Sequence, residues 1–490
     1  MEQNQQPEVN PPRAKGSFLK KYWIPIVTVV ILLALVGVWI FMGNARTYKD
    51  AEDLLAKGQY EQAIEKFESL GGYRDSEERA LEACYQNAKA YYEDGSFDKA
   101  IEWFDKAGDY QDAQEKKNQS IYQRGHELFV QEDYEQAQTY FDQLGEEITT
   151  YGVLHFATLE DARETIVTQA LNAEPVISME IGDLQSCMQQ DNAIRGLTHL
   201  AQTELAEVEV SGTSLTIKPV IYPGVRVVAA WKNGTLDALS QEDTELYQKA
   251  SGLVEQAKSQ TNSQLELELW LHDWLCENVT YDNTNSGAWT GSGNLQPEWT
   301  ATSALLQGKA NCQGYSDAFY LLGSLAGFDV RFQYGKVGTE AHCWNVIKMP
   351  DEQWYYMDVT YDNDIERYMP NETTHAYVNF VRSQETRTIW PNSQSAEIAK
   401  SVNDSYNYYQ QQNKVVSSLN DTIKTCIDKA RNGEASVDLK IKQTWLDHNQ
   451  ISNTLKNELN NQGIAASWTV YCINTNDATY LNLHWDSFGQ

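Results

Sequence analysis

The stretch KANCQGYSD, residues 309–317, is the most informative part of this chain, because it places a cysteine at the predicted start of a helix. After its cysteine, apolar residues recur at the spacing of one helix face, at Tyr315, Phe319, Leu322 and Leu325. The pattern predicts an amphipathic helix that begins at Cys312 and ends at Gly327. The unpaired amides and the positive dipole end of such a helix stabilise a thiolate, and the same amides can bind an oxyanion. A cysteine taken alone is more often a small buried apolar residue, so a nucleophile also needs a base nearby.

A histidine and an aspartate follow on predicted strands. The strands are VRFQYGKV (330–337) and the two halves of HCWNVIKMPDEQWYYMDVT (342–360), with a turn over Met349–Gln353. His342 and Asp358 each lie eight residues from Pro350. A hairpin centred on Pro350 would place these two side chains opposite each other on one side of the sheet. Asp358 would then orient the imidazole of His342, and His342 would take the thiol proton of Cys312.

Residues 309–363 resemble the transglutaminase-like superfamily of cysteine enzymes. Three motifs carry the resemblance in order and spacing: KANCQGYSDAFYLL for the C-x-G-[YF] helix start, AHCWNVI for the H-x-W-N strand, and WYYMDVTYDN for the W-Y-x-x-D-x-T strand. The segment WLHDWLCENVTYD (270–282) also fits the helix that precedes the catalytic cysteine. The resemblance implies a papain-like α+β core with Cys312 as nucleophile, His342 as general base and acid, and Asp358 as the orienting carboxylate.

Three further residues are candidates for the oxyanion site or the cleft wall, namely Tyr281, Gln313 and Trp344. The alternative for Trp344 is packing against the sheet, and for Tyr281 a structural role in a turn. Cys343 is expected to point away from His342 by strand alternation. We predict no metal, because DVTYDNDIE lacks the glycine-centred spacing of a calcium loop, and no cofactor, because thiolate chemistry at an acyl carbon needs none.

The central domain is predicted over residues 240–400, and its first helices carry start signals. One helix begins at Ser240 and the next at Ser263, each with an acidic residue three positions later, as in a capping box. A short helix is predicted over TATSALLQ (300–307), and Gly308 is its expected end.

A membrane anchor is predicted near the amino terminus. Residues 23–42, WIPIVTVVILLALVGVWIFM, contain no charge in 20 positions, enough to span a bilayer as a helix. A cleaved signal peptide is the alternative, but the apolar run is long and no small-residue cleavage site follows. Basic residues are more frequent before the span than after it: Arg13, Lys15, Lys20 and Lys21 against Arg46, Lys49 and Lys57. The positive-inside rule then predicts a cytoplasmic tail over residues 1–22 and an extracytoplasmic bulk.

Residues 46–149 contain three segments at an interval of 37 residues. The equivalent positions are Tyr48, Tyr85 and Tyr122; Tyr60, Phe97 and Tyr134; Ala63, Ala100 and Ala137; Phe67, Phe104 and Phe141. The pattern resembles the tetratricopeptide family, although the usual unit has 34 residues and these units carry an inserted GGYRD or GDYQD turn. The resemblance implies stacked helical hairpins with a groove for a protein partner. A rigid spacer between membrane and enzyme is the equal alternative.

Two small α/β modules are predicted to flank the central domain, over residues 150–225 and 410–490. An ungapped offset of 260 residues aligns Leu159 with Leu419, Asp161 with Asp421, Ala170 with Ala430, Glu174 with Glu434, Met179 with Leu439 and Ile181 with Ile441. Each copy begins as a helix and continues with the alternation of a half-buried strand. Neither copy shows a chemical motif, so a supporting or recognition role is expected.

The composition fits a multidomain α+β protein of 490 residues, 41% of them hydrophobic. A net charge of −31 disfavours nucleic acid as a partner, and seven dispersed cysteines disfavour a disulfide framework. We therefore predict a single-pass, membrane-anchored enzyme of bacterial type that acts on protein or peptide amides. Water as acceptor makes it a protease or amidase, which we prefer because the bacterial relatives are often described as peptidases, and a lysine amine makes it a cross-linker. The rival hypothesis is a non-catalytic surface scaffold with a vestigial triad.

Overall fold

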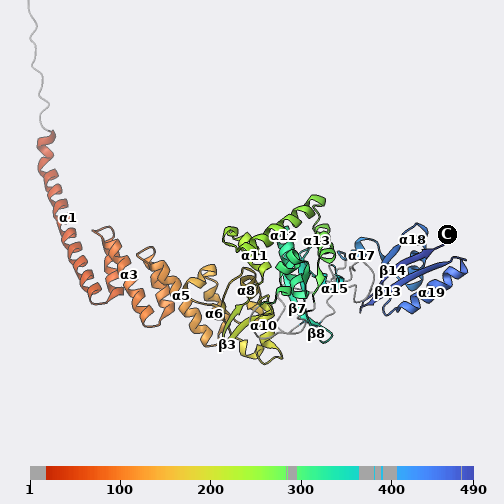
Figure 1. The fold of residues 1–490 in the computed structure, drawn as a ribbon. Coiled ribbons are helices and arrows are strands. Elements are labelled where there is room, and N and C mark those ends of the chain that lie inside the picture. Colours follow the sequence, from red (N-terminus) through yellow and green to blue (C-terminus); the bar gives the residue numbers. More distant parts are fainter. Residues whose placement is uncertain are drawn as a thin grey trace, which may run out of the picture. The chain divides into compact units, whose positions relative to one another are not determined.

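The computed structural model describes residues 18–282, 284, 295–363, 380, 388–389, 405–475 and 477–489. The predicted tail up to residue 17, the loop over residues 283–294 apart from Thr284, and most of residues 364–404 lie outside the described residues. The chain divides into two compact units, Met1–Gly152 and Val153–Gln490 (Figure 1).

The first unit begins with one long helix, α1 (Phe18–Ala56). Its apolar part contains the predicted span, and its length and composition are sufficient to cross a membrane. The large apolar side chains described between Trp23 and Met42 are exposed, as expected of a helix that no protein core covers. The helix continues without a break from the predicted span into the predicted repeat region, which begins at residue 46, and ends at Ala56. The apolar span and the first repeat helix are therefore one element.

The helices after α1 are α2 (Tyr60–Leu70), α3 (Ser76–Glu93), α4 (Phe97–Ala107), α5 (Ala113–Val130) and α6 (Tyr134–Phe141). The positions aligned at the 37-residue interval make equivalent contacts, since the rings of Tyr48, Tyr85 and Tyr122 lie against Phe67, Phe104 and Phe141. The inserted turns stabilise the packing of the repeats by hydrogen bonds. Asp75 and Asp112, the last residues of GGYRD and GDYQD, accept hydrogen bonds from the hydroxyls of Tyr48 and Tyr85 at 2.6 Å.

The second unit contains two small sheets of one topology. The first has the order β1-β2-β4-β3, made of β1 (Leu154–Phe156), β2 (Ile177–Ile181), β4 (Ser214–Pro219) and β3 (Ala206–Ser211). The second has the order β11-β12-β14-β13, made of β11 (Val415–Val416), β12 (Ser436–Ile441), β14 (Thr479–Phe488) and β13 (Ala466–Asn474). In both sheets the first pair is parallel and the others are antiparallel.

The helices of the two modules also correspond. The first module has α8 (Leu159–Leu171), the short α9 (Leu184–Cys187) and α10 (Ala193–Leu200), and the second has α18 (Leu419–Arg431) and α19 (His448–Asn461). Thr158 and Ser418, which are 260 residues apart, cap α8 and α18 by accepting a hydrogen bond from the amide three residues later.

Between the two modules in the sequence lies the central domain, which is built around helix α14 (Cys312–Ala326). Around it are α11 (Pro223–Lys232), α12 (Gln241–Gln260), α13 (Gln264–Asn278) and the sheet β10-β7-β8-β9, made of β10 (Thr388–Ile389), β7 (Asp329–Val337), β8 (Glu340–Lys348) and β9 (Trp354–Met357). The core includes Val225, Val227 and Val228 of α11, so it begins before the predicted boundary at residue 240.

The helix predicted from Cys312 to Gly327 is confirmed, and Gly327 ends it in the left-handed conformation at φ 103°. The expected amphipathic character is wrong, because every residue from Gln313 to Leu325 is buried. Helices pack on one side of α14 and strands β7 and β8 on the other, so the polar residues of its sequence face protein rather than water.

Of the two capping boxes predicted in the central domain, the structure supports the one at Ser240 in part and contradicts the one at Ser263. Half of the box predicted at Ser240 forms: Ser240 caps α12 by accepting from the Asp243 amide at 3.0 Å, while the Asp243 carboxylate accepts from Arg226. The box at Ser263 is wrong, because its side chain makes no capping hydrogen bond. The hydroxyl of Thr261 instead bonds Glu266 and accepts from the Ser263 amide.

Candidate functional site

Cys312 is the first residue of α14, and the residue before it caps the helix. The side-chain oxygen of Asn311 accepts hydrogen bonds from the amides of Gln313 (3.0 Å) and Gly314 (3.2 Å). These amides are therefore occupied, which corrects the expectation that they bind an oxyanion. The Asn311 side chain does not bind the amide of Cys312 itself.

A short parallel ladder holds the backbone ahead of Cys312. Gly308, at φ 70°, ends the π-helical turn η4 (Ser303–Gln307) and leads into β6 (Lys309–Ala310), which pairs with β5 (Thr280–Tyr281). The Asn311 amide donates to the Glu298 carbonyl at 2.9 Å. The ladder places Tyr281, a cleft candidate that is 43% exposed, opposite Ala310, two residues before Cys312.

His342 and Asp358 are buried and in contact, with 2.7 Å between the imidazole Nε2 and a carboxylate oxygen. The geometry differs from the predicted one, because Asn345 pairs with Met357 and the hairpin is centred on Asp351 rather than Pro350. The two side chains are therefore diagonal and not directly opposite.

Asp358 lies past the end of β9, at the start of α15 (Val359–Asn363). One of its oxygens contacts His342, and the other accepts a hydrogen bond from the Tyr361 amide at 3.1 Å. The carboxylate is thus held by the helix it caps while it orients the imidazole.

The electrostatics favour a charged imidazole. Burial alone would lower the pKa of His342, but the Asp358 carboxylate, by its charge and its hydrogen bond, and a hydrogen bond with Cys312 together raise it to about 9. At neutral pH an imidazolium beside Cys312 stabilises negative charge on the sulfur. Cys312 is only partly buried, so a reagent can reach it.

The structure also fixes β8 against the catalytic helix. The side-chain amide of Asn345, three residues after His342, donates to the Ser316 carbonyl of α14 at 3.1 Å. Because Asn345 and Cys343 are two residues apart on one strand, both face α14, and Cys343 is part of the central core. All seven cysteines of the chain are free thiols.

The remaining cleft candidates are buried. Trp344 stacks on the ring of His342 at 5.7 Å between centroids and packs with Val346, Trp354 and Tyr356. It is 1% exposed, so it supports the histidine from the sheet and does not line an open cleft. Gln313 is 2% exposed and points into the protein.

One buried cluster was missed by sequence reasoning. The two ring nitrogens of His272, on α13, lie 3.0 Å from Asp273 and 3.3 Å from Asp362 of α15. Burial opposes the charge, but Cys276 and the two carboxylates raise the pKa of His272 well above its ordinary value. The sequence does place Asp362 one helical turn after Asp358, which could have indicated a second acidic residue near the site. No nearby residue in the sequence indicates that His272 is its partner.

Comparison with known proteins gave a family match for part of the central domain. No curated protein matches the chain. The family model described as "Transglutaminase-like superfamily" matches residues 250–359, and the part of the chain that holds Cys312, His342 and Asp358 is a domain of that superfamily.

Proposed function

We propose that this protein is a membrane-anchored cysteine enzyme that transfers acyl groups from peptide or side-chain amides through a thioester on Cys312. The supporting observation is the buried pair of Asp358 and His342 at 2.7 Å, beside a partly exposed cysteine at a helix start. A hydrogen-bonded carboxylate and imidazole next to a thiol is the arrangement that activates sulfur for acyl transfer.

The chemistry follows from these three groups. The Cys312 sulfur attacks the amide carbon, and the Cys312 backbone amide, which the Asn311 cap does not bind, is the candidate donor to the oxyanion that forms. His342 gives its proton to the leaving nitrogen as the carbon–nitrogen bond breaks, which leaves a thioester. Water or an amine then gives a proton to His342 and attacks the thioester, and the carbon–sulfur bond breaks to restore the thiolate. We favour water, hence a protease or amidase.

The location is part of the proposal. The exposed apolar part of α1 supports a single membrane span, with the enzyme domain on the extracytoplasmic side. The helices over residues 60–141 would then separate the domain from the bilayer or bind a partner.

Thiol labelling tests the catalytic proposal. Purified full-length protein is treated with iodoacetamide at pH 6, and the modification rate of each cysteine is followed by peptide mass spectrometry. Cys312 should react at least about tenfold faster than the other six cysteines, because its thiolate is paired with an imidazolium. His342→Gln should remove that advantage while leaving the other rates unchanged.

A Cys312 that reacts no faster than the other six would contradict the enzyme proposal and favour the scaffold. If it is reactive, comparison of surface proteins between cells with the wild-type chain and cells with Cys312→Ala identifies the substrate. New amino termini indicate hydrolysis, and products of increased mass indicate cross-linking.

A further inference from the structure

The first module, residues 153–222, contacts strand β7 of the central domain at three neighbouring positions. Arg331 forms an ion pair with Glu164 of α8 at 2.6 Å. The backbone amide of the next residue, Phe332, donates to the side chain of Gln202 at 2.8 Å. Two residues later, the ring of Tyr334 stacks on His199, with 4.4 Å between centroids and 12° between planes.

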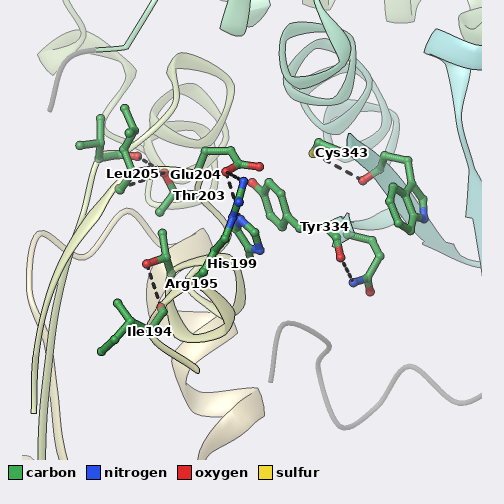
Figure 2. A network of polar contacts seen from close by, with 12 residues as sticks. Ile194, Arg195, His199, Thr203, Glu204, Leu205, Tyr334 and Cys343 are labelled. Carbon is green, nitrogen blue, oxygen red and sulfur yellow. Dashed lines mark hydrogen bonds and ion pairs between the residues drawn. The ribbon is translucent and has the colours of Figure 1, made fainter. Parts of the chain in front are cut away.

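The ring of His199 is held by a carboxylate behind it. Figure 2 shows His199 beside the ring of Tyr334, with Glu204 at its other edge, 3.1 Å from the imidazole Nε2. Arg195 lies 3.6 Å from the same carboxylate, and the Glu204 amide donates to the hydroxyl of Tyr222 at 3.1 Å. Burial would raise the pKa of Glu204, but His199 and Arg195 lower it, so this carboxylate is charged.

Tyr334 in turn lies next to chain neighbours of both catalytic residues. In the β7–β8 ladder it is paired with Cys343, the residue after His342. Tyr334 shares the central core with Tyr315 and Tyr320 of α14. Burial raises the Tyr334 pKa well above its ordinary value, and Gln313, the residue after Cys312, is among the smaller influences on it. The Tyr334 side chain therefore lies where α14 and β8 approach each other.

The pair of His199 and Glu204 is not required by the fold of the module itself. At the 260-residue offset, the segment from His199 to Ala206 corresponds to residues 459–466, LNNQGIAA. That segment has no ionisable residue, although the second module has the same strand order. The pair occurs in the module that contacts β7, which indicates a role at that contact.

We propose that the first module is an integral part of the catalytic unit: His199, held by Glu204, braces Tyr334, and Tyr334 sets the distance between Cys312 and His342. His199, Glu204 and Tyr334 are positioning residues, and Gln313 transmits the constraint to the start of α14. The proposal rests on the proposed function, since it concerns the pairing of the thiolate and the imidazolium. It gives the module, which has no chemical motif of its own, a defined function.

The pH profile of Cys312 alkylation in the full-length protein tests whether His199 and Tyr334 position the catalytic pair. In the wild type the rate should stay high from pH 10 down to pH 6, because the His342 imidazolium stabilises negative charge on the reacting sulfur. His199→Ala should lower the rate about tenfold at pH 6 and less than about twofold at pH 10, since a misplaced imidazole matters only where the thiolate depends on it. Tyr334→Phe, which keeps the stacked ring, should show a smaller loss of the same kind.

Two further variants separate positioning from stability. The double variant His199→Phe with Glu204→Gln keeps a flat ring on Tyr334 and removes the imidazole together with the Glu204 charge, so its rate at pH 6 should lie within about twofold of the wild type. His155→Ala is the matched control, because His155 is a buried histidine of the same module that contacts the Val153 carbonyl at 2.9 Å. It should lower the Tm without changing the profile.

Retention of the rate at pH 6 in both His199→Ala and Tyr334→Phe would overturn the bracing role, as would an equal loss in His155→Ala at equal Tm. If His199→Ala does not fold, Tyr334→Phe decides the question: a retained rate at pH 6 overturns the bracing, and a loss there beside a retained rate in the double variant supports it. A wild-type Cys312 with no fast reaction at pH 6 would overturn the proposed function together with the bracing. A fast wild type with unaffected variants would overturn the bracing alone.

Discussion

At the residue scale, Asp358 has two structural roles, one for each of its carboxylate oxygens. One oxygen fixes the imidazole of His342, and the other accepts the Tyr361 amide at the start of α15. An asparagine could keep the second contact but would present no charge to the imidazole. The residue therefore couples the position of a helix to the protonation of the proposed base.

Asp358→Asn should lower the pKa of His342 from about 9 toward or below its ordinary 6.5. In the wild type the raised pKa contributes stability that is fully present below pH 6.5 and is lost as the pH rises through 9. The variant should lack this dependence, and its Cys312 alkylation at pH 6 should fall by about 10²-fold or more, on the scale of other triad carboxylates. Imidazole NMR titration and urea unfolding at pH 6 and pH 9 measure both effects. An unchanged histidine titration would contradict the assignment.

Gly314 is a second residue whose identity the site requires. A Cβ at this position would lie 2.5 Å from the Glu298 carbonyl oxygen and 2.9 Å from the Cβ of Ala310, both at the backbone that holds the helix start. Gly314→Ala should therefore destabilise the protein by about 1–3 kcal/mol and slow alkylation of Cys312. Gly252→Ala in α12 is the control, since its Cβ would have no neighbour within 4 Å, and it should be neutral or stabilising by about 0.5–1 kcal/mol. Equal unfolding free energies for the two variants would contradict this reading.

At the element scale, α15 is short and depends on contacts with longer helices. Its last residue, Asn363, donates to the Val279 carbonyl at 2.7 Å, just after the end of α13. Asp362 lies against His272 of α13, with both side chains fully buried. These contacts hold the element that Asp358 caps, so the position of the proposed orienting carboxylate depends on α13.

His272→Ala should therefore be strongly destabilising, by about 3–5 kcal/mol, because it leaves the Asp362 carboxylate buried without its cation. Replacement of both residues, His272→Leu with Asp362→Leu, should recover much of the loss, since no buried charge then remains. Urea unfolding at pH 7 measures the three proteins. A double variant as unstable as the single one would indicate that the pair is held for its shape rather than its charge.

At the scale of the whole molecule, α1 joins the apolar span to the helical repeats without a break. A continuous helix transmits orientation better than a flexible linker, since its backbone hydrogen bonds are all made within the element. The repeats would then leave the membrane in the direction of the span.

The full-length protein should remain with the membrane fraction after alkaline carbonate washing and be released by detergent, because about 20 apolar residues span a bilayer. A chain that begins at residue 44 should be found in the soluble fraction and serves as the control. Protease added outside intact cells should degrade the enzyme domain and spare a tag placed before residue 18. Release by carbonate would contradict a membrane span, and protection of the enzyme domain would reverse the proposed orientation.

The sequence alone determined the elements and the order of the chemical groups. The helix from Cys312 to Gly327, strands β7, β8 and β9, and the superfamily of residues 250–359 all follow from local signals: apolar periodicity, a glycine that permits positive φ, and short motifs. Such signals depend on residues close together in the chain, so they can be recognised without knowledge of the tertiary contacts.

The tertiary structure decided what surrounds these elements. Only packing could bury α14 on all sides, centre the β8–β9 hairpin on Asp351, and bring Glu204 and His199 of a separate module against Tyr334. The physical reason is that register, burial and ion pairing depend on contacts between residues far apart in the chain. Local periodicity shows that a face is apolar or a strand present, but it carries no information on which distant surface covers it.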